Sequence, residues 1–215
     1  MAGGTHARLA ELAAEAADCR NCGLWEHATQ TVFGEGDPHT PIVLVGEQPG
    51  DAEDRAGRPF VGPAGRILDE ALSAAGLGRD DLYLTNAVKH FKWTAKGKRR
   101  IHERPNRAEV VACRPWLDAE LSIVQPAVLV VLGATAGQAL FGSKFRVGAA
   151  RESTLDYQGV PVVATIHPSA VLRAPDAGAR EEMHGGLVRD LEKARDLAGL
   201  PVSAAGTAPP RSAQA

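Results

Sequence analysis

Four short apolar runs recur along the chain, each bounded by polar or turn-forming residues. They are Ile42–Val45, Leu82–Thr85, Val128–Leu132 and Val160–Ile166. Continuous apolar runs of about four to eight residues are typical of strands that are covered on both faces of a parallel sheet. The pattern therefore predicts four buried strands.

Stretches with helical periodicity lie between and around these runs. The expected helices cover His6–Ala17, Pro63–Ala75, Asn106–Ile123, Ala134–Leu140 and Gly178–Ala198. Pro63 opens its helix and Gly76 follows it, the usual order of these two residues. Asn106 and Glu109 resemble a capping box, although Pro115 is expected to start or kink a turn. Alternating strands and helices predict an α/β fold, a three-layer αβα domain with a central, largely parallel four-stranded sheet.

Length and composition suit one domain over residues 1–198, because about 200 residues can enclose a single core. Gly199–Ala215 contains five Ala, three Pro and one charged residue, and we expect a disordered tail there. No apolar run is long enough to cross a membrane, and the first residues lack the apolar core of a secretory signal. We therefore expect a cytoplasmic monomer without a membrane partner.

Positive charge is concentrated in one segment of an otherwise acidic chain. Lys89–Arg107 has eight Lys or Arg residues and one acidic residue, a net charge of +7, whereas the remainder carries −9. Phe91 and Trp93 lie within this segment, so it could neutralise phosphates and stack on bases. A solvated charged loop is the alternative. The contrast with the rest of the chain favours nucleic acid, with phosphate contacts expected from Lys96, Lys98, Arg99 and Arg100.

Three cysteines, an odd number, fit a metal site or free thiols better than a disulfide framework. Cys19 and Cys22 form a C-x-x-C pair, and Cys113 is the third thiol. His90, just after the second predicted strand, is the natural fourth ligand. A redox pair, a buried pair and a Cys₃His zinc site are the alternatives to a cluster.

Polar side chains follow the predicted strands where ligands of parallel α/β sheets bind. Glu47 follows the first strand, Asn86 the second and His167 the fourth. Each also has an ordinary structural interpretation: a solvated glutamate, a loop-capping asparagine or a satisfied imidazole in a His-Pro turn. Phe60 lies in a glycine-flanked loop and could either pack in the core or stack on a base.

Taken together, these motifs resemble the uracil-DNA glycosylase superfamily. The matching segments are Gly46–Gly50, Pro59–Arg66, Thr85–Lys89 and His167–Ser169. The C-x-x-C pair and Cys113 match the iron–sulfur branch, and the resemblance covers about residues 19 to 195. The Lys98–His102 segment is similar to that of the UdgX type, which bonds covalently to uracil-containing DNA, and His90 stands where other members of the branch have a cysteine.

The resemblance implies a cofactor and a set of site residues. It implies a [4Fe-4S] cluster held by Cys19, Cys22, His90 and Cys113. It also implies that uracil, preferentially in single-stranded DNA, is extruded into a pocket. Phe60 would stack on the base and Asn86 would pair with its amide edge, while His167 and backbone amides near Gln48 would stabilise the departing uracil.

The same resemblance implies that His102 replaces water as the nucleophile at deoxyribose C1′. Glu47 would orient this imidazole or accept its proton. Two alternatives remain open at this point. The first is an ordinary iron–sulfur glycosylase that releases uracil and a free abasic site, and the second is an inactive nucleic-acid-binding module.

Overall fold

The four predicted strands form the parallel centre of the sheet in the computed structural model, which describes residues 2–153 and 155–202. They are β2 (Ile42–Gly46), β3 (Leu82–Asn86), β6 (Val128–Leu132) and β8 (Val160–Thr165), in the order β3-β2-β6-β8. Every residue of β2, β3 and β6 is buried, as their continuous apolar runs require. The predicted α/β class and the largely parallel central sheet are confirmed.

Two short antiparallel strands extend this sheet to six strands, two more than the sequence predicts. β1 (Glu35–Gly36) pairs with β3 at one edge, and β7 (Leu155–Tyr157) pairs with β8 at the other. Strands of two and three residues are too short to carry an alternating pattern, which is why only the central four were predictable.

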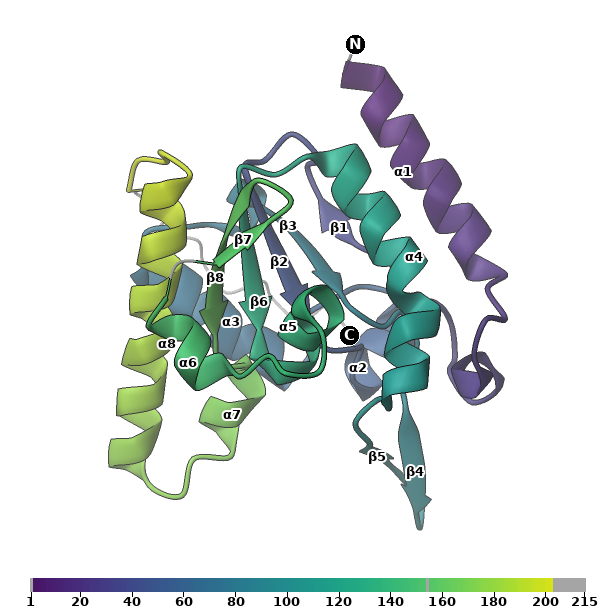
Figure 1. Ribbon diagram of the computed structural model, residues 1–215. Coiled ribbons are helices and arrows are strands. Elements are labelled where there is room, and N and C mark those ends of the chain that lie inside the picture. Colours follow the sequence, from purple (N-terminus) through teal and green to yellow (C-terminus); the bar gives the residue numbers. More distant parts are fainter. Residues whose placement is uncertain (1, 154, 203–215) are drawn as a thin grey trace, which may run out of the picture.

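Helices cover both faces of the sheet, giving the three predicted layers (Figure 1). One face is packed by α4, α5 and α6, and the other by α3 and α8, while α1 packs against α4. The bounds are α1 (Ala2–Ala17), α2 (Asp51–Ala56), α3 (Pro63–Ala74), α4 (Arg107–Val124), α5 (Gly133–Phe141), α6 (Val147–Arg151), α7 (Pro168–Leu172) and α8 (Ala177–Leu197), with 3-10 turns η1 (Gly23–Glu26) and η2 (Arg79–Asp81).

The capping box predicted at the start of α4 is present. Asn106 Oδ1 accepts a hydrogen bond from the Glu109 backbone N at 2.9 Å, and the Glu109 carboxylate accepts one from the Asn106 backbone N at 2.6 Å. The expectation of a turn at Pro115 is wrong, because α4 continues through it. The carbonyl that loses its partner there belongs to Val111, an exposed residue that water can reach.

The basic segment contains a β-hairpin, for which the sequence pattern predicted no strands. β4 (Trp93–Lys96) and β5 (Arg99–His102) pair antiparallel, with Trp93 opposite His102 at the end nearest the domain. Gly97 has a φ of +60° in the two-residue turn, a conformation that favours glycine. The hairpin projects from the domain, so its tip lies away from the sheet and His102 lies at its base (Figure 1).

The expected disordered tail, 199–215, falls mostly outside the described residues, which end at position 202. The prediction of a single domain over 1–198 stays a prediction. Within the described ranges, no helix combines the length and apolarity needed to cross a membrane.

Candidate active site

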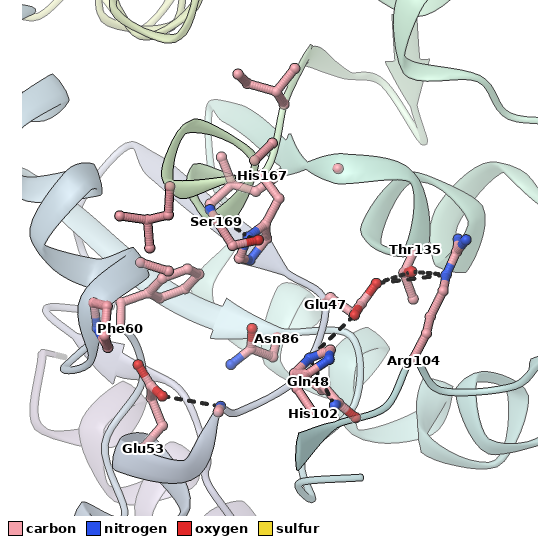
Figure 2. Close-up of a pocket in the computed structure, with 18 of the residues that line it drawn as sticks. Glu47, Gln48, Glu53, Phe60, Asn86, His102, Arg104, Thr135, His167 and Ser169 are labelled. Atoms are coloured by element: carbon pink, nitrogen blue, oxygen red, sulfur yellow. Dashed lines mark hydrogen bonds and ion pairs between the residues drawn. The ribbon is translucent and has the colours of Figure 1, made fainter. Parts of the chain in front are cut away.

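The carboxyl ends of the central strands open into a cleft of about 1000 Å³. Segments that follow β2, β3, β6 and β8 form its walls, at the edge where parallel α/β sheets bind ligands. Six of the predicted site residues line this cleft, namely Glu47, Gln48, Phe60, Asn86, His102 and His167 (Figure 2). The fold therefore brings together residues that are up to 120 positions apart in the sequence.

Asn86 ends β3 and is buried beside Gly46, its partner on β2. A Cβ atom on Gly46 would overlap Asn86 Oδ1 and would lie 2.6 Å from Phe60 Cζ. Glycine at position 46 therefore leaves the space that the amide and the ring occupy. Within residues 2–153 and 155–202 the Asn86 side-chain amide has no hydrogen-bond partner, so its donor and acceptor both remain available to a ligand.

Phe60 presents its ring to the cleft from a backbone conformation that non-glycine residues rarely adopt. Its φ is +54°, and strain of this kind costs on the order of 1 kcal/mol. Arg79 Nη2 donates to the Phe60 carbonyl, and Gly65 packs so closely on that carbonyl that a Cβ would overlap it. The ring is 6.3 Å from that of His167, with 28° between their planes, so the two form adjacent parts of the cleft wall.

His167 caps α7, and its hydrogen bonds define its tautomer. The Ser169 backbone N donates to His167 Nδ1 at 3.2 Å, so Nδ1 carries the lone pair and the ring proton is on Nε2. Burial, together with smaller electrostatic contributions from His102 and Arg173, lowers the pKa of His167 to about 4. At neutral pH His167 is therefore an uncharged hydrogen-bond donor in the cleft wall.

His102 lies at the mouth of the cleft with its side chain 48% exposed. Its Nε2 is 3.5 Å from Glu47 Oε1 and 3.0 Å from Gln48 Nε2. The nitrogen therefore faces a proton acceptor, the carboxylate, and a hydrogen-bond donor, the amide. The protonated ring can donate to Glu47. A neutral ring with a lone pair on Nε2 can accept from Gln48 Nε2, whose two N–H groups are shared among this nitrogen and the carbonyls of Lys92 and Glu103.

Contacts to the second carboxylate oxygen of Glu47 hold this side chain in place. Oε2 accepts a hydrogen bond from Thr135 Oγ1 and lies 3.8 Å from Arg104 Nε. Arg104 Nε also donates to Thr135 Oγ1 at 3.0 Å, which closes a small network at the start of α5 (Figure 2). Glu47 therefore presents one oxygen to His102 while the other is fixed.

Gln48 attaches the hairpin to the loop after β2. Its Nε2 donates to the Lys92 carbonyl at 3.2 Å and to the Glu103 carbonyl at 3.0 Å, and its Oε1 accepts from the Lys92 backbone N at 3.2 Å. These bonds reach both ends of the hairpin. Because the Gln48 side chain is bonded to the hairpin, a uracil contact here would come from backbone amides near Gln48, as the resemblance implies. This contact stays a prediction.

Arg100 differs from the other three residues predicted to bind phosphate. It forms an ion pair with Asp51 and another, at 2.6 Å, with the fully buried Asp54, and it lies 5.5 Å from the ring centres of Phe91 and Trp93. Burial by itself would raise the pKa of Asp51. Hydrogen bonds from Arg55 and Arg100 outweigh this effect, so the pKa of Asp51 is lowered. A phosphate contact at Arg100 stays a prediction, whereas its protein contacts fasten β5 to α2.

Five further cations of the basic segment divide into two groups. Lys89 is buried and paired with Glu120, and Lys92 lies 3.1 Å from Glu109. Lys96, Lys98 and Arg99 are exposed at the hairpin tip, and in the part of the chain that the structure describes they form no ion pair. The net charge of +7 therefore overstates the charge available to a polyanion.

The four predicted metal ligands come from four segments that converge beside α4. Cys19 follows α1, Cys22 precedes η1, His90 follows β3, and Cys113 lies within α4. Burial raises the pKa of Cys113 to about 11, with nearby Lys89 opposing this and the other two sulfurs adding to it. Two sulfurs already accept hydrogen bonds, Cys19 from Trp116 Nε1 at 3.1 Å and Cys113 from the Lys89 backbone N at 3.2 Å.

The hydrogen bonds of His90 leave one ring nitrogen for a metal. Thr31 Oγ1 donates to the Ala16 carbonyl at 3.1 Å, so toward His90 Nε2, 2.9 Å away, the hydroxyl acts as acceptor. Nε2 therefore carries the proton and Nδ1 the lone pair, an arrangement common for metal-binding histidines. Burial and the charge of Arg20 lower the pKa of His90, with Asp54 opposing them, so the neutral form is favoured.

The spacing of this ligand set exceeds what a single ion requires. Ligands about 2.0–2.3 Å from one zinc ion lie within about 4.6 Å of one another. Among the described residues only His6, Asp37 and His39 gather three such donor atoms within 4.8 Å, on the exposed surface. No three donor atoms of Cys19, Cys22, His90 and Cys113 gather within this distance, so the arrangement is wider than a closed zinc site.

Several residues of this site were not predicted from the sequence. Thr135 lies directly after the third predicted strand, but nothing in the sequence distinguishes its hydroxyl. Arg104 was counted only as part of the charge run. Asp54 and Glu53 lie on the six-residue helix α2, which is too short for its acidic residues to form a recognisable pattern. Glu53 accepts hydrogen bonds from the backbone N of Gly50 at 3.1 Å and of Gly62 at 2.8 Å, and so joins two loops of the cleft.

The fold and the cleft define an α/β protein with a ligand-sized cleft at the carboxyl ends of its parallel strands, beside the base of a basic hairpin. Residues 33–192 match the family model described as the uracil DNA glycosylase superfamily, and the chain belongs to this superfamily. It is 37% identical over 196 residues to the type-4 uracil-DNA glycosylase of Thermotoga maritima, covering 90% of this chain and 96% of that protein. It is also 38% identical over 169 residues to a type-4 uracil-DNA glycosylase of Pyrobaculum aerophilum, covering 74% and 81%.

Proposed function

We propose that this protein is a uracil-DNA glycosylase of the UdgX type, which excises uracil and then remains bonded to the DNA through His102. The observation that carries the proposal is the position of His102. Its Nε2 lies 3.5 Å from Glu47 Oε1 at the mouth of the cleft, with nearly half of the side chain exposed to an incoming sugar. Family membership and the type-4 relatives support the excision step.

Recognition of uracil rests on Asn86 and Phe60. Uracil offers an O4 acceptor and an N3–H donor, which complement the donor and acceptor of the Asn86 amide. Cytosine presents the opposite pattern, so it would leave buried groups of the amide unpaired. Stacking on the Phe60 ring adds affinity for any base. Single-stranded DNA is the favoured substrate, because no base pair must be broken before the base enters the cleft.

Departure of uracil is assisted by His167. When the bond between C1′ and N1 breaks, its electron pair leaves with uracil, which becomes an anion. The neutral His167 Nε2–H and backbone amides near Gln48 donate hydrogen bonds to the developing charge. Donors that are already in position stabilise such charge without a reorganisation cost. A low pKa at His167 keeps this donor uncharged over the physiological pH range.

Capture of the sugar follows from the contacts of His102. The lone pair of Nε2 forms a bond to C1′ as the bond to uracil breaks. Glu47 Oε1 faces Nε2, so it can take the Nε2 proton of a protonated ring before the attack and so free this lone pair. The proton left on Nδ1 is lost to water after the attack, and the uracil anion takes up a proton from solvent. The product is a neutral N-linked imidazole with no activated leaving group, so the protein stays attached.

Cys19, Cys22, His90 and Cys113 would hold a [4Fe-4S] cluster. The donor set supports this, because His90 has a free Nδ1 and two of the sulfurs receive N–H donors, as iron–sulfur ligands commonly do. When bound, the cluster ties α1 and the base of the hairpin to α4. Glycosidic cleavage transfers no electron, so we assign these ligands a structural role.

The experiment that tests the proposal uses a labelled single-stranded oligonucleotide with one uracil and a thymine control. The purified protein is incubated with each, and the products are separated on a denaturing gel after treatment with SDS and heat. We expect a uracil-dependent band at the mass of protein plus DNA, with the adduct mapped to His102 by peptide mass spectrometry. DNA that breaks only after alkali indicates an ordinary glycosylase, and unchanged DNA indicates a binding module.

Two variants assign the nucleophile. His102→Ala should lose the covalent band and release abasic DNA, because water can reach C1′ once the imidazole is absent. His39→Ala is the matched control, since His39 is exposed before β2, at the opposite end of that strand from the cleft. Crosslinking that persists in His102→Ala would contradict the assignment. The visible absorption of each preparation separates an iron–sulfur protein, which is brown, from a colourless zinc protein.

A further inference from the structure

Lys89, three residues after the end of β3, and Glu120 on α4 form a fully buried ion pair. Their side chains are 1% and 0% exposed, respectively. Removing two charges from water costs several kcal/mol per ion, so such a pair persists only when further hydrogen bonds satisfy both groups. The pair lies outside the cleft, and no step of the proposed reaction uses it.

Glu120 is fully satisfied by groups on three segments. Its carboxylate accepts hydrogen bonds from Tyr83 Oη at 3.0 Å, from Thr85 Oγ1 at 2.9 Å and from the Gly34 backbone N at 3.0 Å, in addition to the Lys89 ammonium. Burial raises the pKa of Tyr83, and the adjacent carboxylate raises it further, so the phenol remains a donor. Glu120 therefore fixes the position of the Lys89 ammonium.

The Lys89 ammonium uses its three N–H groups on three different acceptors. One binds Glu120, one binds Thr85 Oγ1 at 2.7 Å, and the third binds the backbone carbonyl of Asn86 at 2.8 Å. Asn86 is the residue whose free side-chain amide faces the cleft. A buried cation with every donor occupied cannot turn, so it holds the Asn86 peptide at a fixed position.

We infer that Lys89 is a positioning residue for uracil recognition: anchored by Glu120, it fixes the Asn86 backbone and thereby the amide that reads the base. This inference rests on the proposed function, because it assigns Asn86 the reading of uracil. Reading by hydrogen bonds is sensitive to small displacements, and a shift of about 1 Å can lower a rate a hundredfold. Lys89 thus supports base selection without contacting DNA, despite lying in the basic segment.

The test is a double-mutant cycle between Lys89 and Asn86, measured as the rate of uracil processing under single-turnover conditions. In the otherwise wild-type protein, Lys89→Met should lower this rate about tenfold or more. In the Asn86→Ala variant, the same substitution should lower it less than about twofold. Tyr83→Phe is the matched control. It removes another hydrogen bond from Glu120 but none from Asn86, so it should slow either background less than about threefold. Equal effects of Lys89→Met in both backgrounds, or of Tyr83→Phe and Lys89→Met, would overturn the inference.

Folding and cluster content are controlled separately. Lys89→Met leaves the Glu120 charge unpaired, so Lys89→Met/Glu120→Met, which makes both sites apolar, is tested in parallel and should show the same loss of rate. Visible absorption per protein should equal that of the wild type in each preparation. If the double variant processes uracil at the wild-type rate, Lys89 does not position Asn86.

Crystal structures distinguish failure of the inference from failure of the proposed function. A wild-type protein without activity on uracil-containing DNA would overturn the proposed function alone. The inference still predicts one ordered Asn86 rotamer in the wild type and in Tyr83→Phe, and a displaced or multiply occupied side chain in Lys89→Met. An unchanged Asn86 in Lys89→Met crystals would refute the inference whatever the activity.

Discussion

At the scale of single residues, the cleft depends on space as much as on functional groups. Gly46 is the clearest case, because no other residue type leaves room for both Asn86 Oδ1 and the Phe60 ring. Its requirement is steric, since its φ is not positive. The glycine that ends β2 is therefore as important to the shape of the proposed base site as Asn86 and Phe60 themselves.

We expect Gly46→Ala to reduce the rate of uracil processing by about a hundredfold, since the added methyl group displaces Asn86 and Phe60 together. Single-turnover rates on a uracil oligonucleotide measure this effect. Gly148→Ala is the control, because Gly148 is helical and a Cβ there would have no heavy atom within 4 Å. Comparable rates for Gly46→Ala and the wild type would show that the cleft relaxes around the methyl group.

A second prediction at this scale concerns pH and His167. In the folded protein the His167 imidazole takes up a proton only near pH 4, whereas in the unfolded chain it does so near pH 6.5. The unfolded state binds more protons between these values, so stability falls as the pH falls through that window. From pH 7.5 to 5.5, wild type should lose on the order of 1 kcal/mol more free energy of unfolding than His167→Asn.

Urea unfolding of both proteins at the two pH values, under anaerobic conditions, measures this difference. His90 also has a lowered pKa, but it is present in both proteins and cancels in the comparison. Equal losses in the two proteins would mean that His167 is not held in its neutral form.

Single residues also mark the limit of prediction from the sequence. Glu47, Asn86 and His167 could be found because each follows a recognisable buried strand. The partners of Lys89 and Arg100 could not, because Glu120 and Asp54 are 31 and 46 positions away, respectively, and no local pattern connects them. As a result, two cations that the structure shows to be bound within the protein looked like part of a DNA-binding run.

At the scale of elements, the β4–β5 hairpin carries the proposed nucleophile, His102, and is attached to the domain at its base. Gln48 binds both of its ends, and Arg100 joins it to α2 through Asp51 and Asp54. The pairing of β4 with β5 was not predictable, because basic residues hide the apolar–polar alternation in strands of only four residues. The central strands were predictable because their apolar runs are continuous and each is bounded by turn residues.

Arg100→Lys separates fastening of the hairpin from phosphate binding. Lysine keeps the positive charge but lacks the planar fork that reaches two carboxylates. We expect the rate of covalent capture to fall at least about tenfold, while affinity for single-stranded DNA changes less than about twofold. Arg99→Lys, at an exposed position one residue earlier, should alter neither quantity. A parallel loss of affinity and rate in Arg100→Lys would favour a direct phosphate contact.

At the scale of the whole molecule, the distribution of free charge governs binding to DNA. The protein has a net charge of −2, and four of the eight cations of its basic segment, Lys89, Lys92, Arg100 and Arg104, lie near carboxylates of the protein itself. Lys96, Lys98 and Arg99 at the hairpin tip are the exposed cations of that segment's β-strands and turn. Affinity for the DNA backbone should therefore depend on few contacts rather than on the eight cations of the sequence.

We expect the triple variant with alanine at Lys96, Lys98 and Arg99 to bind DNA with a weaker salt dependence. The slope of log K against log salt concentration should become less negative by about 2, since each phosphate contact to single-stranded DNA contributes about 0.7. Fluorescence anisotropy with a thymine-containing oligonucleotide at several salt concentrations measures the slope. Alanine at Arg8, Arg189 and Lys193, all exposed on α1 and α8, gives the same change in net charge away from the hairpin. Equal slopes for both triple variants would argue against phosphate contacts at the tip.

The two-stranded form of the hairpin has a consequence for self-association. A ribbon of two strands has an unpaired edge on each side, and such edges can pair with the same edge of a second copy. The basic side chains at the tip repel an identical hairpin and so keep these edges apart. The alanine variant designed to weaken DNA binding removes that repulsion, and light scattering should detect its concentration-dependent dimers.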